Sequence, residues 1–140
     1  MKKIIIIFLL FSTLSFADDI AIVKVVEGTP IIKRENETIN VKLGDILKTK
    51  DTLITNSNSK VGIIFNDGSS LTLGESSFLN IEQYNFKPIE DEYKFTLNLE
   101  KGKLMFESGK IGDLSPESFE LKIPDGAIGI RGTKFLVEIK

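Results

Sequence analysis

Asp67-Gly68-Ser69-Ser70 is the string in this chain that most invites a chemical interpretation, as a serine nucleophile or as a metal-binding turn. A nucleophilic serine needs a base within hydrogen-bonding reach. The 140 residues include no histidine and no cysteine, which excludes Ser-His and Cys-His pairs, and no lysine is spaced so as to single out a Ser-Lys pair. Asp-Gly between alternating strands is the usual signal of a tight turn, so we expect Asp67, Gly68 and Ser69 to form a structural hairpin.

Acidic residues offer two further kinds of chemistry. Asp45 and Asp51 are placed to supply oxygen ligands to Ca²⁺ from one edge, but the chain has no Asp-x-Asp-x-Asp-Gly loop. The alternative is that each accepts hydrogen bonds from backbone amides of its own turn. The acids of Glu90-Asp91-Glu92 are adjacent instead of facing each other across a cleft, as a glycosidase pair would. The sequence therefore predicts no metal, no cofactor and no enzymatic activity.

Arg131 is the charged residue with the most apolar surroundings, between Gly129 and Gly132 and close to Ile128 and Phe135. A buried guanidinium needs a carboxylate or carbonyl partner. We expect a structural ion pair with Asp125 or Asp67, and the alternative is a ligand-binding role.

The elements that must position these residues are strands. Apolar residues alternate through most of the chain after residue 18, at the two-residue period of half-buried strands, and no helical period persists over three turns. Short strands separated by regular turn signals predict one all-β domain of two packed sheets, as a β-sandwich or a solenoid-like fold. Predicted strands lie around residues 20–26, 31–32, 39–43, 61–65, 71–73, 95–99, 104–106, 119–123 and 135–139.

Turn signals separate these strands. Glu35-Asn36-Glu37 predicts a hairpin tip, Lys101-Gly102 a turn, and Ser115-Pro116-Glu117 the start of one helical turn. The string "GDILKTKDTLIT" contains an internal echo, because a Leu follows two residues after Asp45 and again after Asp51. Either a quasi-repetitive sheet or two similar turns would give this pattern.

The N-terminus has the three parts of a secretory signal peptide: a basic start at Lys2-Lys3, a short apolar run, and Ser15-Phe16-Ala17 as a small-x-small cleavage site. The alternative is a retained membrane anchor, but residues 4–16 fall short of the roughly 20 apolar residues that a spanning helix needs. We therefore expect a signal peptide over residues 1–17, one domain over residues 18–140, and no stable membrane anchor after cleavage. Export without cysteine suits a bacterial periplasm.

The charge balance bears on partners. Without Lys2 and Lys3, the 18 basic residues become 16 against 20 acidic ones, a net charge of −4. Nucleic acid and anionic lipid both favour a basic stripe, so neither is expected as a partner. Sheet edges can accept a strand from another protein, and we expect another envelope protein as the partner, with Val25 and Ile139 as candidate edge positions.

Ordered motifs now give a family resemblance. Gly44-Asp45-Ile46-Leu47, Asp51-Thr52-Leu53-Ile54-Thr55, Asp67 to Leu73, and the closing "PDGAIGIRGTKF" follow one another in the order typical of the FecR-type periplasmic domain. The chain resembles that family from about Val25 to Val137. The residues that carry the resemblance are Gly44, Asp45, Asp51, Asp67, Gly68, Ser69, Arg131, Gly132 and Thr133.

The resemblance implies a binding role. Family members include anti-sigma regulators, whose domain outside the inner membrane receives a signal from an outer-membrane receptor. Because the apolar segment starts at residue 4, no cytoplasmic sigma-binding segment is expected here. We expect a periplasmic, non-enzymatic protein-binding or scaffolding module in cell-envelope signalling. The alternatives are an envelope hydrolase, a carbohydrate-binding β-protein, or a subunit of a surface or secretion assembly.

Overall fold

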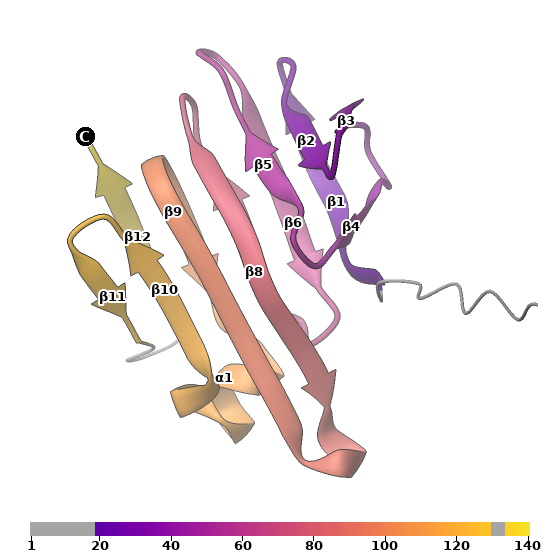
Figure 1. Ribbon diagram of the computed structural model, residues 1–140, viewed down its shortest axis with the longest axis vertical. Helices are drawn as coiled ribbons and strands as arrows, with labels where there is room; N and C mark the ends of the chain where they lie inside the picture. Colours follow the sequence, from indigo (N-terminus) through magenta and orange to yellow (C-terminus); the bar gives the residue numbers. More distant parts are fainter. Residues whose placement is uncertain (1–18, 130–133) are drawn as a thin grey trace, which may run out of the picture.

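The computed structural model describes residues 19–129 and 134–140, and most of them lie in strands (Figure 1). The all-β prediction is confirmed, whereas the expected signal peptide lies outside the described residues. The strands are β1 (Asp19–Glu27), β2 (Ile31–Arg34), β3 (Glu37–Asn40), β4 (Ile46–Lys48), β5 (Thr52–Ile54), β6 (Lys60–Phe65), β7 (Ser70–Leu73), β8 (Phe78–Lys87), β9 (Glu92–Glu107), β10 (Phe119–Ile123), β11 (Gly126–Ile128) and β12 (Lys134–Ile139).

The 12 strands of the described residues belong to one continuous sheet, where the sequence predicted two packed sheets. The main path runs β3-β2-β5-β8-β9-β7-β6-β1-β4, while β10 and β12 pair with β9, and β11 pairs with β10. The long strand β9 is the reason for the continuity, because it pairs with β8 through Glu92–Lys101 and with β7 through Leu104–Glu107. Between these two stretches lies Gly102, whose φ of 101° is open to glycine but strained for other residues.

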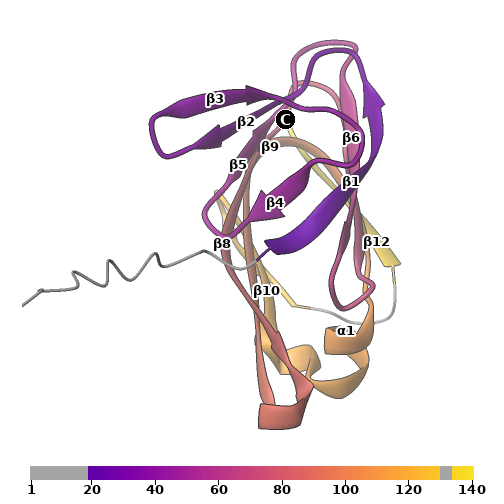
Figure 2. The same cartoon turned by 90° about the vertical axis from the view of Figure 1, so that its right-hand side faces the viewer.

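The sheet curls so that its two halves face each other (Figure 2). We call the strands β3, β2, β5, β8, β10, β11 and the first part of β9 the β8 half. The strands β4, β1, β6, β7, β12 and the last part of β9 form the β6 half.

The hydrophobic core lies between the two halves. Along β6, Val61, Ile63 and Phe65 are buried while Ile64 is partly exposed, as the two-residue period predicts. Phe95 of β9 stands at the centre of an aromatic cluster that joins both halves, with ring centroids 4.6 to 5.6 Å from four other rings. Each fully buried side chain of this size contributes roughly 1.5–3 kcal/mol. The four rings belong to Phe65, Tyr84, Phe106 and Phe119.

In the part of the chain that the structure describes, three short helical elements occur among the connections. The predicted helical turn at Ser115-Pro116-Glu117 is confirmed as a 3-10 turn, η2 (Pro116–Ser118), while α1 (Lys110–Leu114) was not predicted. Together they return the chain from the end of β9 to β10, which pairs with β9 in parallel and so requires a crossover. A second 3-10 turn, η1 (Pro88–Glu90), joins β8 to β9. Within the described ranges, no helix is long and apolar enough to cross a membrane.

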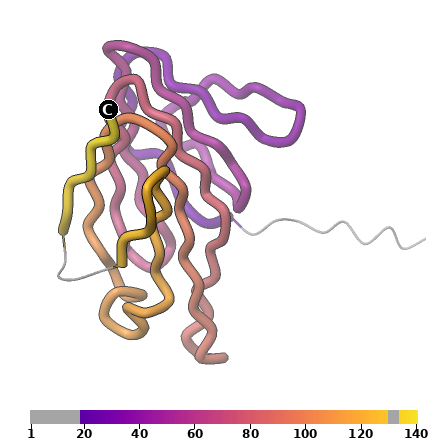
Figure 3. Tube along the Cα trace, turned by 60° about the vertical axis from the view of Figure 1, so that its left-hand side comes forward, coloured from indigo at the N-terminus to yellow at the C-terminus, as the bar shows by residue number. Residues whose placement is uncertain are grey.

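The two predicted edge positions, Ile139 and Val25, lie in strands of different kinds. Ile139 lies in β12, which pairs only with β9 among the described residues and is an edge strand (Figure 3). Val25 lies in β1, which pairs with β6 and, through Asp19–Ile22, with β4, so β1 is an interior strand. At Val25 itself, however, β1 pairs with β6 alone among the described residues.

Candidate binding surface

Asp45 and Asp51 occupy the same position in two equivalent turns. In each turn an aspartate Oδ2 accepts a hydrogen bond of 2.8 Å from the backbone N–H three residues earlier, Lys42 or Lys48. The N–H of each aspartate donates back to the carbonyl of that same residue at 3.1 Å. The residue before each aspartate has a positive φ, 86° at Gly44 and 74° at Lys50. The echo in the sequence is therefore a repeated turn.

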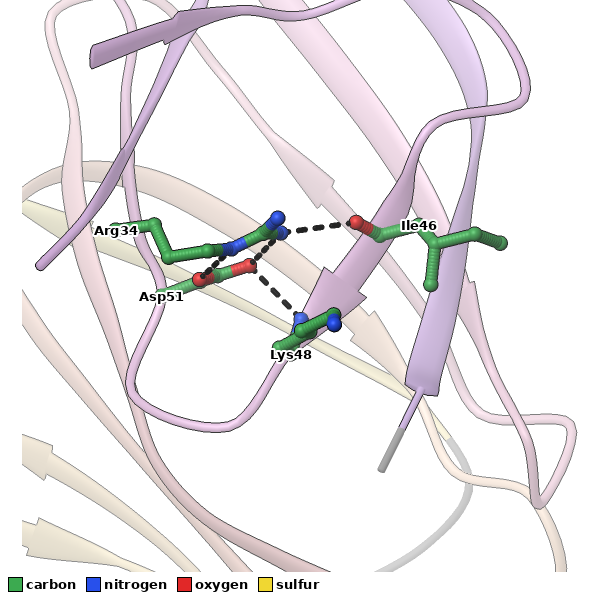
Figure 4. A network of polar contacts seen from close by, with 4 residues as sticks. All are labelled: Arg34, Ile46, Lys48 and Asp51. Atoms are coloured by element: carbon green, nitrogen blue, oxygen red, sulfur yellow. Dashed lines mark hydrogen bonds and ion pairs between the residues drawn. The ribbon is translucent and has the colours of Figure 1, made fainter. Parts of the chain in front are cut away.

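Asp51 has one partner that Asp45 lacks. The Arg34 guanidinium donates from Nε to Oδ1 and from Nη2 to Oδ2, both at 2.8 Å, and Nη2 also donates to the Ile46 carbonyl at 3.1 Å (Figure 4). The Asp51 side chain is 1% exposed and that of Arg34 is 29% exposed. The hydrogen bond to Asp51 raises the pKa of Arg34 above its ordinary value. This bidentate pair fastens the β2–β3 hairpin to the turn before β5.

In the Asp67-Gly68-Ser69 turn, the side chains of Asp67 and Ser69 are buried and hydrogen-bonded, while Gly68 is exposed. The Asp67 carboxylate accepts from Ser69 Oγ at 2.7 Å, from the Ser69 N–H at 3.2 Å and from the Tyr84 hydroxyl at 3.0 Å. Tyr84 in turn accepts from the Asp67 N–H at 2.9 Å. Burial, and then the negative charge of Asp67, raise the pKa of Tyr84 above its usual value. Gly68 has a φ of 87° and completes the turn.

The same turn holds the segment that precedes α1. Ser69 Oγ accepts from the Gly109 N–H at 2.9 Å, and Asp67 accepts from Ile111 N–H at 3.1 Å through its carboxylate. A Cβ on Gly109 would overlap the Asp67 carbonyl and the Ser69 nitrogen, so only glycine fits there. Because Ser69 donates to Asp67 and accepts from Gly109, its hydroxyl serves the fold and is not held as a nucleophile.

The remaining sequence-predicted positions add no exposed chemistry to the described surface. Arg131, Gly132 and Thr133 lie outside the described residues. No group of three or more acidic, histidine or cysteine side chains within residues 19–129 and 134–140 could hold a metal ion. The side chains of Asp51, Asp67 and Ser69 all take part in internal hydrogen-bond networks and are buried.

An apolar row crosses the outer face of the β6 half. Val25 of β1 lies opposite Gly62 of β6, which lies opposite Thr72 of β7, and the row continues to Met105 of β9 and Leu136 of β12. Val25, Met105 and Leu136 are 42%, 41% and 68% exposed. The row covers four inter-strand spacings of about 4.8 Å, or roughly 19 Å.

A second row on the same face begins with three isoleucines in cross-strand register. Ile46 of β4 lies opposite Ile22 of β1, which lies opposite Ile64 of β6. Ile46 and Ile64 are partly exposed. We call the two rows together the apolar face, made of Ile22, Val25, Ile46, Gly62, Ile64, Thr72, Met105 and Leu136.

The middle of the β8 half has the opposite character. Its outer row runs through Lys33, Thr52, Asn80, Asn98 and Lys122, on five successive strands. Side chains in and beside this row bond one another: Thr52 Oγ1 donates to Asn80 Oδ1 at 2.6 Å. On the same three strands β2, β5 and β8, a shorter row of half-buried apolar residues lies beside the polar row. It consists of Ile31, Ile54 and Phe78.

Residues 51–140 match the family described as FecR protein. The chain belongs to the FecR family. The matched part contains Asp51 and the whole Asp67 network, whereas Arg34, Gly44 and Asp45 precede it. The matched region therefore begins later than the Val25 expected from the motifs. No curated protein and no solved structure matches the chain.

In this FecR-family chain the described motif residues build the scaffold, and the apolar face was not identified from the sequence. Asp51 and Asp67 are internal, but Met105 and Leu136 belong to no motif. The one sequence signal that could have indicated the face is that residues 20–26 are apolar on both sides of the strand. Ile22 and Val25 face outward there, while Ala21 and Val23 are buried. The register that aligns the five strands of the first row comes from the structure alone.

Charged residues border the apolar face beside β12. Glu107 of β9 lies opposite Lys134 of β12 on one side of the Met105–Leu136 pair, and Lys103 lies opposite Glu138 on the other. All four charged residues are exposed. The apolar centre is therefore bordered by exposed charges of both signs.

Proposed function

We propose that this FecR-family chain is a non-enzymatic periplasmic module that binds another envelope protein through its apolar face and acts in cell-envelope signalling. The observation that carries the proposal is the contrast between its two outer faces. Membership of the FecR family supports the link to envelope signalling, and the N-terminal segment supports export.

The contrast between the two outer faces shows that the exposed apolar residues of the β6 half are not required by the sheet itself. Both outer faces stand on the same sheet and share β9, yet one presents Met105 and the other Asn98. A sheet face that only needs to be solvated alternates apolar inward and polar outward residues. Contiguous exposed apolar residues with a polar border mark interaction sites on soluble proteins. The polar row in the middle of the β8 half follows the solvated pattern, and the apolar face of the β6 half departs from it.

The shape of the apolar face favours a macromolecular partner. Gly62 leaves a flat centre across which the Val25 side chain lies, since a Cβ there would stand 3.1 Å from the Cβ of Val25. Thr72 adds a small side chain beside it. A small-molecule site is usually concave and encloses most of its ligand, whereas a flat strand face suits a protein surface that buries the same residues.

Site-specific photocrosslinking in intact cells tests the proposal. A photoreactive residue at Thr72, inside the apolar face, should capture one envelope protein. The matched position is Asn80, inside the polar row, which should capture far less. Substituting Ile64→Lys in the chain that carries the Thr72 probe should abolish capture, because a charge replaces apolar contact, whereas Thr52→Lys in the polar row should not.

Two outcomes would count against this function. Equal capture from Thr72 and Asn80, or capture that survives Ile64→Lys with the fold intact, would show that the apolar face is not the binding surface. Fractionation of the same cells locates the chain, and a mature N-terminus at Asp18 is expected. Recovery in the cytoplasm would remove the periplasmic role.

A further inference from the structure

The open edge of β12 is complementary to itself. The strand reads Lys134-Phe135-Leu136-Val137-Glu138-Ile139, and among the described residues it pairs on one side only, with β9. Its outward side chains alternate in kind, as lysine, leucine and glutamate at positions 134, 136 and 138. We infer that two copies of this chain associate by antiparallel pairing of their β12 strands about a two-fold axis at Leu136. The inference goes beyond the proposed function and does not depend on it.

Backbone geometry fixes which residues of β12 can pair outward. The Gly74 N–H donates to the Lys103 carbonyl at 2.8 Å, so the peptide groups of Lys103 face β7. Peptide groups along an antiparallel strand alternate in direction, so those of Leu104 and Phe106 face β12. Their partners Val137 and Phe135 therefore bond β9, and the peptide groups of Leu136 face the open side, together with those of Lys134 and Glu138.

A two-fold axis at Leu136 uses these free groups in matched pairs. Leu136 of one copy then lies opposite Leu136 of the other, and each exchanges both backbone hydrogen bonds. Lys134 of each copy lies opposite Glu138 of the other, which gives two such pairs. Shifting the register by two residues places Lys134 opposite Lys140 and Leu136 opposite Glu138, while a shift by four places Glu138 opposite Glu138. Like charges directly opposite each other destabilise a strand pair and opposite charges stabilise it. A shift by two residues in the other direction places Lys134 opposite Leu136 and forms no charge pair, so among these registers the Leu136 register is the one that pairs opposite charges.

The Leu136 register also continues two rows of side chains that are present in one copy, the apolar row and the rows of alternating charge beside it. Across the two-fold axis, Met105 and Leu136 are followed by Leu136 and Met105 of the second copy, which extends the apolar row. On each side of it, Glu107 and Lys134 are followed by Glu138 and Lys103 of the second copy. The charges alternate in sign over four strands. On the inner face, the half-buried Phe135 lies opposite Val137 of the second copy, which covers apolar surface left open at the core margin.

Sedimentation equilibrium of the full chain, with charge reversals at the paired positions, tests this interface. The parent chain should dimerise with increasing concentration. Lys134→Glu and Glu138→Lys should each weaken the dimer about tenfold, because each creates two like-charge pairs. The double variant Lys134→Glu/Glu138→Lys should recover the parental affinity. That recovery can only be intermolecular, because within one copy the double variant places like charges opposite Glu107 and Lys103. Lys33→Glu in the polar row is the control and should leave dimerisation unchanged.

A backbone variant gives a second, independent readout. Leu136→Pro removes an N–H that faces the open side, so the dimer should be lost while the thermal midpoint of the monomer stays near that of the parent. Val137→Pro removes an N–H that bonds β9 and should destabilise the monomer itself. A parent chain that stays monomeric, a double variant that stays dissociated, or dimerisation retained by Leu136→Pro would overturn the inference. None of these outcomes changes the expected capture from Thr72.

Discussion

At the scale of single residues, the two aspartate turns form an internal comparison. Asp45 and Asp51 make the same backbone hydrogen bonds, and only Asp51 is buried and paired with Arg34. Removing one partner of a buried charge pair leaves the other charge without compensation. Asp51→Asn should therefore lower the free energy of unfolding by about 2–3 kcal/mol. Asp45→Asn, in the same turn without the arginine, should cost less than about 1 kcal/mol.

Urea denaturation of the two variants measures this difference directly. Substituting asparagine keeps the shape of the side chain and one acceptor oxygen, so the two turns lose equivalent bonds apart from the ion pair. Equal losses in both variants would mean that Arg34 contributes nothing beyond the turn itself. Arg34→Met should match Asp51→Asn in direction, because either change breaks the same pair.

Of the contacts made by Asp45 and Asp51, the sequence could predict the local ones only. The echo around Asp45 and Asp51 is visible in the sequence because local hydrogen bonds span three residues. Arg34 was not identified, because it lies 17 residues before Asp51 and only the pairing of β2 with β5 brings them together. A buried aspartate requires a partner, but its spacing along the chain does not name one.

At the scale of elements, the Asp67 network determines how the crossover from β9 to β10 is held. Tyr84 both accepts from the Asp67 N–H and donates to its carboxylate, and that carboxylate binds Ile111 at the start of α1. Tyr84→Phe leaves two buried polar groups short of a partner and should cost about 1–3 kcal/mol. Amide hydrogen exchange at Ile111 should speed up more than exchange in β6. Tyr93→Phe, on the neighbouring strand and outside this network, is the control and should change neither quantity much.

Tyr84 also makes the free energy of unfolding depend on pH in the alkaline range. Burial and the charge of Asp67 hold the pKa of Tyr84 above its ordinary value of 10.0. Above about pH 10 the unfolded chain binds fewer protons at this site than the folded chain, so stability is fully present below that pH and falls as pH rises. Tyr84→Phe should lose less stability between neutral and alkaline pH than the parent, whereas Tyr93→Phe should follow the parent. Parallel curves for all three would contradict a role for the Tyr84 hydroxyl.

At the scale of the whole molecule, one strand makes two half-sheets into a single folded unit. The sequence predicted a turn at Lys101-Gly102 between separate strands, because glycine after an alternating run usually ends a strand. In the structure the strand continues through Gly102 and changes partners, from β8 to β7. Strand alternation is local and was predictable, whereas the choice between a reversal and a bend depends on what packs against the glycine. Here that neighbour is Ser77, which no local pattern indicates.

Gly102→Ala should therefore destabilise both halves together. Its φ of 101° strains any side chain, and a Cβ would overlap both Ser77 Oγ and the Ser77 backbone, so we expect a loss of about 2–4 kcal/mol. Gly44→Ala is the matched control, because its φ of 86° is similar but nothing lies within 4 Å of the added Cβ, and about 1 kcal/mol is expected from strain alone. Amide exchange should rise equally in β6 and β8, since β8 pairs with β9 directly and β6 is joined to β9 through β7. Loss of protection confined to β8 would show that the halves are separate folding units despite the strand they share.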